Sequence, residues 1–97
     1  MFVGTLECDV LLGDVRSLKD KRGLVRPVLA ELRRLDVAAA EVGHQDLHRR
    51  ALLGVAAVAG DAARVGEVLD TAERLVAGRP ELELLSTRRS LRETDDD

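Results

Sequence analysis

The residues best suited to binding chemistry are four bases in and just after SLKDKR, residues 17–22. Lys19 and Lys21 are the only two lysines in a chain with thirteen arginines. A lysine ammonium is compact and mobile, which suits non-directional contact with phosphate better than the reading of bases. Lys19, Lys21, Arg22 and Arg26 are therefore candidate RNA- or phosphate-binding residues. The alternative interpretation is a set of solvated bases on the outer face of a capped helix.

The distribution of charge favours the same segment. Residues 13–36 hold seven basic and four acidic residues, a net charge of +3, whereas the rest of the chain carries -6. Cations in a first helical turn oppose the helix dipole, yet the free backbone N–H groups there can receive an anion. No glycine-rich cradle such as a P-loop precedes the segment, so the motif indicates phosphate contact without naming a ligand.

A second group of possible ligands lies in GHQDLHR, residues 43–49. His44, Asp46 and His48 offer imidazole and carboxylate groups, which bind zinc or iron. A closed site needs a third or fourth ligand, and the single cysteine, Cys8, lies far away in the first expected strand. We interpret the segment as a polar hairpin connection and expect no metal.

The remaining reactive side chains do not complete a catalytic set. Cys8 alternates with Leu6 and Val10, which predicts a buried, unreactive thiol. Glu7 and Asp9 lie on the other face of the same strand and could act as paired carboxylates. The sequence places no His or Lys beside them, and Gly-x-Ser-x-Gly, Cys-x-x-Cys and Gly-x-Gly-x-x-Gly are absent. We expect neither an enzyme nor a cofactor.

Length and composition indicate one soluble domain. Ninety-seven residues suit a single core, built from Leu, Val and Ala because Phe2 is the only aromatic residue. A lone cysteine, no leader segment and no apolar run long enough to span a bilayer predict a cytoplasmic protein without a membrane partner. The domain is expected to cover residues 1–92, and the acidic residues 93–97 are expected to form a disordered tail.

The first half of the chain predicts a strand followed by a helix. Apolar residues alternate through residues 2–12, as in a half-buried strand. Ser17 followed by Asp20 approximates a capping box, which predicts a helix from Leu18. Pro27 should kink this helix or make it begin near Gly23, because a proline cannot donate to the carbonyl four residues back.

The second half predicts three strands and another helix. Residues 36–42 and 50–59 read as strands, the latter apolar on both faces. Asp61 is a suitable cap for a helix that ends at Gly78. Residues 81–92 alternate as a fourth strand, except that Leu84 and Leu85 fall on opposite faces, which a bulge would accommodate.

The order β-α-β-β-α-β predicts a ferredoxin-like α+β fold, with two helices on one face of a four-stranded antiparallel sheet. The expected core includes residues from both layers, namely Val10, Leu29, Leu53, Val55, Leu69 and Leu75. Leu52, Ala56 and Val58 alternate with the core-facing residues of the strand at 50–59 and would expose an apolar patch, which predicts a homodimer formed through the open sheet face or a sheet edge.

The chain resembles the YlxP-like bacterial proteins, a domain family of unknown function. The resemblance covers residues 1–92 and is carried by SLKDKR, by VAAAEVG at 37–43, by QDLHRRALLG at 45–54 and by the helix that Asp61 begins. It implies a ferredoxin-like fold and, through the usual company of the family's genes, a loose association with ribosome or RNA biology. It implies no reaction and no catalytic residues. Relatives often carry an aromatic residue where this chain has His48, which weakens any stacking role there.

Two functions remain open from the sequence. The leading one is a small non-catalytic adaptor that binds RNA or a ribosomal particle weakly through the basic first helix. RNA-recognition domains stack bases on sheet aromatics, and Phe2, the sole aromatic, is expected on the core face. Phosphate contact therefore remains as the means of binding. The alternative is a homodimeric protein-interaction module with no nucleic-acid partner.

Overall fold

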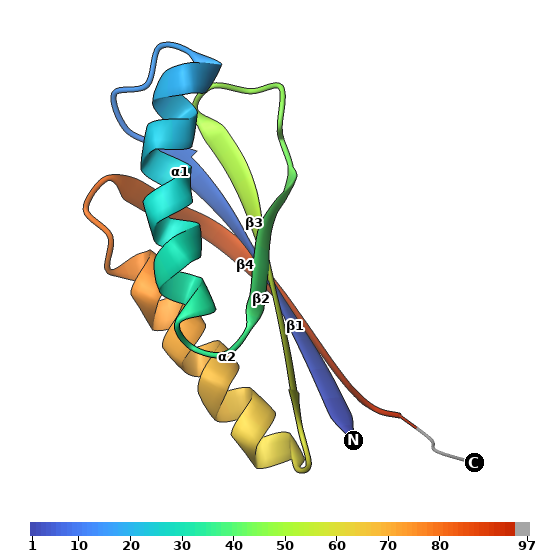
Figure 1. Cartoon of the computed structure of the whole chain (residues 1–97). Helices are drawn as coiled ribbons and strands as arrows, with labels where there is room; N and C mark the ends of the chain where they lie inside the picture. The colour runs from blue at the N-terminus through green and yellow to red at the C-terminus, as the bar shows by residue number, and fades with distance from the viewer. Residues whose placement is uncertain (95–97) are drawn as a thin grey trace.

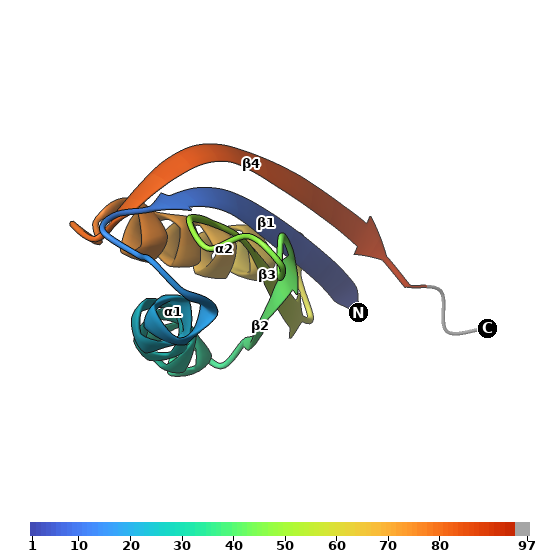
Figure 2. The same cartoon turned by 90° about the horizontal axis from the view of Figure 1, so that it is seen from above.

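A computed structural model describes residues 1–94 of the chain. It contains two helices and four strands in the predicted order, namely β1 (Phe2–Leu12), α1 (Leu18–Arg33), β2 (Ala38–Gly43), β3 (Arg50–Ala59), α2 (Ala62–Ala77) and β4 (Leu82–Glu93). The strands form one sheet in the order β2-β3-β1-β4, and each neighbouring pair is antiparallel. Both helices lie on the same side of the sheet (Figures 1 and 2). The predicted ferredoxin-like fold is confirmed.

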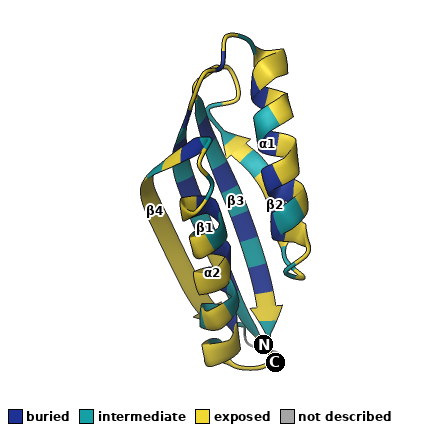
Figure 3. Ribbon diagram, turned by 90° about the vertical axis from the view of Figure 1, so that its left-hand side faces the viewer, coloured by how far each residue is buried: buried dark blue, intermediate teal, exposed yellow. Residues whose placement is uncertain are grey.

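The core lies between the helices and one face of the sheet (Figure 3). Leu6, Cys8 and Val10 alternate along β1 and are fully buried, because every second side chain of a strand points to the same face. Of the six predicted core residues, five are buried. The exception is Leu75, which is only partly buried because the neighbouring Val76 occupies the inward position on α2.

The first helix begins where its cap predicts. Ser17 Oγ accepts a hydrogen bond from the Asp20 N–H at 3.1 Å, and the Asp20 carboxylate accepts one from the Arg16 N–H at 3.3 Å. The helix then runs unbroken through Pro27. The expectation that it might begin near Gly23 is therefore wrong, since the capped first turn is already helical.

The second strand begins two residues later than predicted. Asp36 has a φ of 61°, a left-handed conformation that aspartate tolerates better than most residues. This residue turns the chain after α1, so that β2 starts at Ala38 rather than at Asp36 and ends at Gly43.

The fourth strand contains the irregularity that its sequence suggested. Asp9 pairs with Ser86 and Val10 pairs with Leu84, which leaves Leu85 as the extra residue of a bulge. The strand ends at Glu93, one residue beyond the expected end of the domain. Thr94 then donates its N–H to the Met1 carbonyl at 2.8 Å, so the described ends of the chain lie side by side. The last three residues of the expected acidic tail, 95–97, lie outside the described residues.

Candidate functional site: the basic face of α1 and the open face of the sheet

Three of the four predicted phosphate-binding residues form an exposed basic face on α1. Lys19, Arg22 and Arg26 are exposed, and within residues 1–94 none of them makes a side-chain hydrogen bond or an ion pair. Their spacing of three and four residues aligns them on one side of the helix. Gly23 lies among them, and a side chain there would meet no atom within 4 Å. The outer surface of the helix is therefore open between the cations.

Lys21 is not on this face, and the expectation that it lies beside the other bases is wrong. Its side chain is only 3% exposed, and it points between α1 and the β2–β3 connection. Nζ donates to the carbonyl oxygens of His44 and Leu47, both at 2.8 Å, and lies 2.6 Å from Glu41 Oε2. The last contact is an ion pair by distance, although its angles are outside those of a hydrogen bond. With three oxygens around it, this ammonium cannot also receive an external phosphate.

The burial of Lys21 follows from its position in the helix. It lies on the same helical stripe as Val25, Val28 and Leu32, which are all buried. A lysine is rarely buried unless it is paired, so its type indicated exposure while its spacing indicated burial. The spacing was the better signal.

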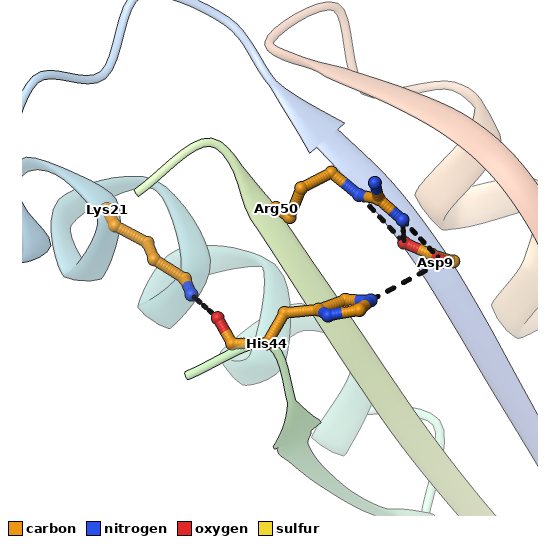
Figure 4. A network of polar contacts seen from close by, with 4 residues as sticks. All are labelled: Asp9, Lys21, His44 and Arg50. Atoms are coloured by element: carbon orange, nitrogen blue, oxygen red, sulfur yellow. Dashed lines mark hydrogen bonds and ion pairs between the residues drawn. The ribbon is translucent and has the colours of Figure 1, made fainter. Parts of the chain in front are cut away.

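The loop that Lys21 holds directs His44 toward the open face of the sheet. His44 has a φ of 58°, and its carbonyl also accepts the Leu47 N–H at 3.0 Å. Its imidazole Nε2 lies 3.5 Å from Asp9 Oδ2 (Figure 4). Asp46 and His48 stay exposed in the loop. Within residues 1–94, no three His, Cys, Asp or Glu side chains are grouped as metal ligands would be.

Asp9 is held mainly by Arg50. The guanidinium of Arg50 donates from Nη2 to both carboxylate oxygens, at 2.7 and 2.8 Å, and from Nε to Oδ1 at 3.2 Å (Figure 4). These hydrogen bonds, with a further contribution from His44, lower the pKa of Asp9. The pair is only partly buried, with 22% of the Asp9 side chain and 36% of the Arg50 side chain exposed. Asp9 is therefore ionised and already neutralised within the chain.

The side chains beside this pair form a polar hollow of about 470 Å³ on the open face. We define the polar hollow by Glu7, Asp9, His44, Ser86 and Arg88. Irregularities flank it on both sides, because Val42 has no partner in the β2–β3 register and Leu85 has none in the β1–β4 register. Bulges of this kind redirect side chains and occur often beside functional sites.

An apolar hollow of about 340 Å³ adjoins the polar one, and Glu7 lines both. Its other lining residues are mostly small, and we define the apolar hollow by Ala38, Ala40, Val42, Gly54 and Ala56. Val42 and Gly54 are in close contact, since a side chain at Gly54 would come within 2.9 Å of a Val42 methyl group. The open face thus carries a polar and an apolar compartment side by side.

Cys8 faces the opposite side of the sheet, as predicted. Its side chain is buried in the core, and burial raises the pKa of its thiol to about 11. The thiol is therefore protonated at neutral pH, which makes it a poor nucleophile.

Comparisons with known proteins identify the family of the chain. The described features define a small ferredoxin-like α+β domain with a basic helix and a compound hollow on its open face. The chain belongs to the family described as "Protein of unknown function (DUF503)", which matches residues 3–89. It is 30% identical over 87 residues to the uncharacterized protein YlxP of Bacillus subtilis (strain 168), covering 89% of this chain and 95% of that protein. The YlxP-like resemblance is confirmed. Among the described residues, neither helix has the length and apolar character needed to cross a membrane.

Proposed function

We propose that the protein is a small non-catalytic adaptor that binds RNA or a ribosome-associated particle weakly through the basic face of α1. The observation that carries this proposal is the exposure of Lys19, Arg22 and Arg26 on one helical face, without ion pairs to residues 1–94. Cations that form no ion pair within the described residues remain available to an external anion. Because Lys21 is buried and surrounded by oxygens, the proposal rests on three cations rather than four.

The location of these cations suits phosphate. Lys19, in the first turn of α1, opposes the helix dipole by a few tenths of a kcal/mol, so the helix gains no stability from this cation. The gap left by Gly23 lets a phosphodiester backbone approach the helix closely between Lys19 and Arg26. Such contacts are sequence-tolerant and depend strongly on salt.

The salt dependence of binding to single-stranded RNA tests the proposal. If about three phosphates are neutralised, the logarithm of the binding constant should fall against the logarithm of salt concentration with a slope of about -2. Replacing Lys19, Arg22 and Arg26 together by Gln should remove most of this slope. A matched control replaces Arg64, Arg74 and Arg92 by Gln, which removes the same charge elsewhere.

The control variant should keep most of the salt-dependence slope, and at low salt it should remain bound to ribosomes nearly as well as the wild type. If both triple variants lost RNA binding equally, net charge alone would explain the effect, and this would contradict a dedicated basic face. If the wild type and the α1 variant bound RNA and ribosomes equally well at low salt, the proposal as a whole would be contradicted.

A homodimer that associates through the open face is the second candidate, and it requires no nucleic acid. It is favoured by the exposure of Val58, which is 64% exposed on β3, and of Val42, which is 52% exposed and lines the apolar hollow. Apolar side chains gathered on one face commonly mark an interaction surface. Light scattering at high micromolar concentration should give twice the mass of the chain. Val42→Asp with Val58→Asp should halve that mass, whereas Leu18→Asp on α1 should not; a monomeric wild type would refute this candidate.

A further inference from the structure

The free charges of the polar hollow come from Glu7 and Arg88. These residues are directly opposite each other in the β1–β4 register, where oppositely charged side chains commonly pair. Within residues 1–94, however, neither makes a hydrogen bond or an ion pair through its side chain. Asp9 and Arg50 neutralise each other beside them. The polar hollow therefore offers one unpaired carboxylate and one unpaired guanidinium to a ligand.

The loop around the polar hollow is built to hold its shape. Lys21 fixes the backbone of the β2–β3 connection from inside the molecule, and His44 adopts a left-handed conformation that costs free energy. Bulges at Val42 and Leu85 border the same region. Strain and irregular pairing commonly persist where a site must be arranged in advance.

We propose that the two hollows form one binding site for a free α-amino acid with an apolar side chain. The ammonium group would bind Glu7, the carboxylate would bind Arg88, and the apolar side chain would lie between Val42 and Ala56. Glu7 lines both hollows, which brings the anchor for the ammonium next to the apolar compartment. Ser86, beside Arg88 in the hollow, is a further donor to the carboxylate.

The charges in the site favour this ligand over a simple anion or cation. A phosphate monoester would face the carboxylates of Glu7 and Asp9, and a simple amine would leave the Arg88 guanidinium unpaired. A zwitterion satisfies both free groups at once. The hollows measure about 340 and 470 Å³, which lies in the usual range for small-molecule sites. This inference does not depend on RNA binding, because it uses the face of the sheet opposite to α1.

Titrations with four probes, followed by amide NMR, test the proposal on the full chain. Leucine should shift the amide signals of His44, Gly54 and Ser86. N-acetyl-leucine and leucinamide, which each lack one charged end, should bind about tenfold more weakly. Glycine, which lacks the apolar side chain, should also bind more weakly than leucine.

Two variants assign the ends of the ligand. Glu7→Gln should make leucine and N-acetyl-leucine bind equally well, and Arg88→Gln should do the same for leucine and leucinamide. Glu83→Gln and Arg92→Gln, which change charges on β4 outside the polar hollow, should preserve the preference for leucine. The amide spectrum of each variant reports whether it is folded.

Several results would overturn the proposal. One is the absence of any shift in the signals around the two hollows at millimolar leucine, and another is equal binding of leucine and its blocked forms by the wild type. Glycine binding as tightly as leucine would equally rule out the apolar compartment as part of the site.

Discussion

The basic face of α1 and the polar hollow differ in how the chain makes them. The first arises from residues 19–26 alone, through the geometry of one helix. The second combines side chains from β1, the β2–β3 connection and β4, which are far apart in the sequence. Lys21 lies within residues 19–26, yet it contributes to the polar hollow, because it holds the loop that carries His44. A local surface can be read from periodicity, whereas a composite surface also depends on register.

The largest expected loss of stability distinguishes the core face of the sheet from the open face, which carries the hollows. Leu53→Ala should lower the free energy of unfolding by about 2 to 5 kcal/mol, because Leu53 is 1% exposed and the cavity would be lined by core residues. Leu52→Ala on the open face should cost less, since Leu52 is only partly buried. Urea denaturation measures both. Equal costs would mean that the open face is covered, as in a dimer.

Lys21→Met should show that one residue of α1 supports the open face. The expected loss is about 3 kcal/mol, near the lower limit for breaking a buried ion pair because Glu41 is 20% exposed. The NMR signals of His44 and Leu47 should also shift. Lys19→Met, two residues away on the basic face, should change stability by less than about 0.5 kcal/mol. If Lys21→Met changed neither the stability nor the signals of His44 and Leu47, α1 would not support the open face.

The Asp9–Arg50 pair should give the open face its own pH dependence. Arg50 lowers the pKa of Asp9, so the ionised carboxylate stabilises the fold above its unfolded pKa of about 4. This contribution is lost as the pH falls through the lowered pKa, and it should be at most about 1 kcal/mol because both partners touch solvent. Urea denaturation from pH 7 to pH 2 should lose less stability in Asp9→Asn than in the wild type. Asp46→Asn, in the exposed loop, should follow the wild type.

The smallest effect concerns the glycine on the basic face. Gly23→Ala should stabilise the protein by about 0.5 to 1 kcal/mol, because alanine favours the helix and its methyl group would meet no neighbouring atom. The same change should weaken RNA binding if a phosphate lies close to the helix there. Thermal unfolding and RNA titration of one variant measure both. A more stable variant with unchanged RNA binding would mean that the gap at Gly23 is not used.

Most of the fold could be predicted because local signals agreed with one another. The alternation in β1, the caps at Ser17 and Asp61, and the paired Leu84 and Leu85 each correspond to a feature of the structure. The start of β2 could not be predicted, because the apolar pattern of residues 36–42 does not reveal that Asp36 adopts a left-handed conformation.

The candidate sites were less predictable than the fold. Glu7 and Asp9 were recognised on the open face, but the partners of Asp9 are residues 44 and 50, more than thirty positions away. Only the antiparallel register brings them together. Lys21 is hard to place from the sequence, because lysine usually favours exposure whereas its position on the buried stripe favours burial.

The burial of Cys8 makes the thiol an internal reporter of how often the core opens. The side chain is 0% exposed in the central part of the molecule, so a thiol reagent can reach it only when the α2 layer separates from the sheet. The chain has no other cysteine, and it has no tryptophan or tyrosine to report unfolding by fluorescence. With enough reagent for labelling to outpace reclosing, the rate at Cys8 would therefore measure the frequency of core opening at a single atom, in the native protein and without denaturant.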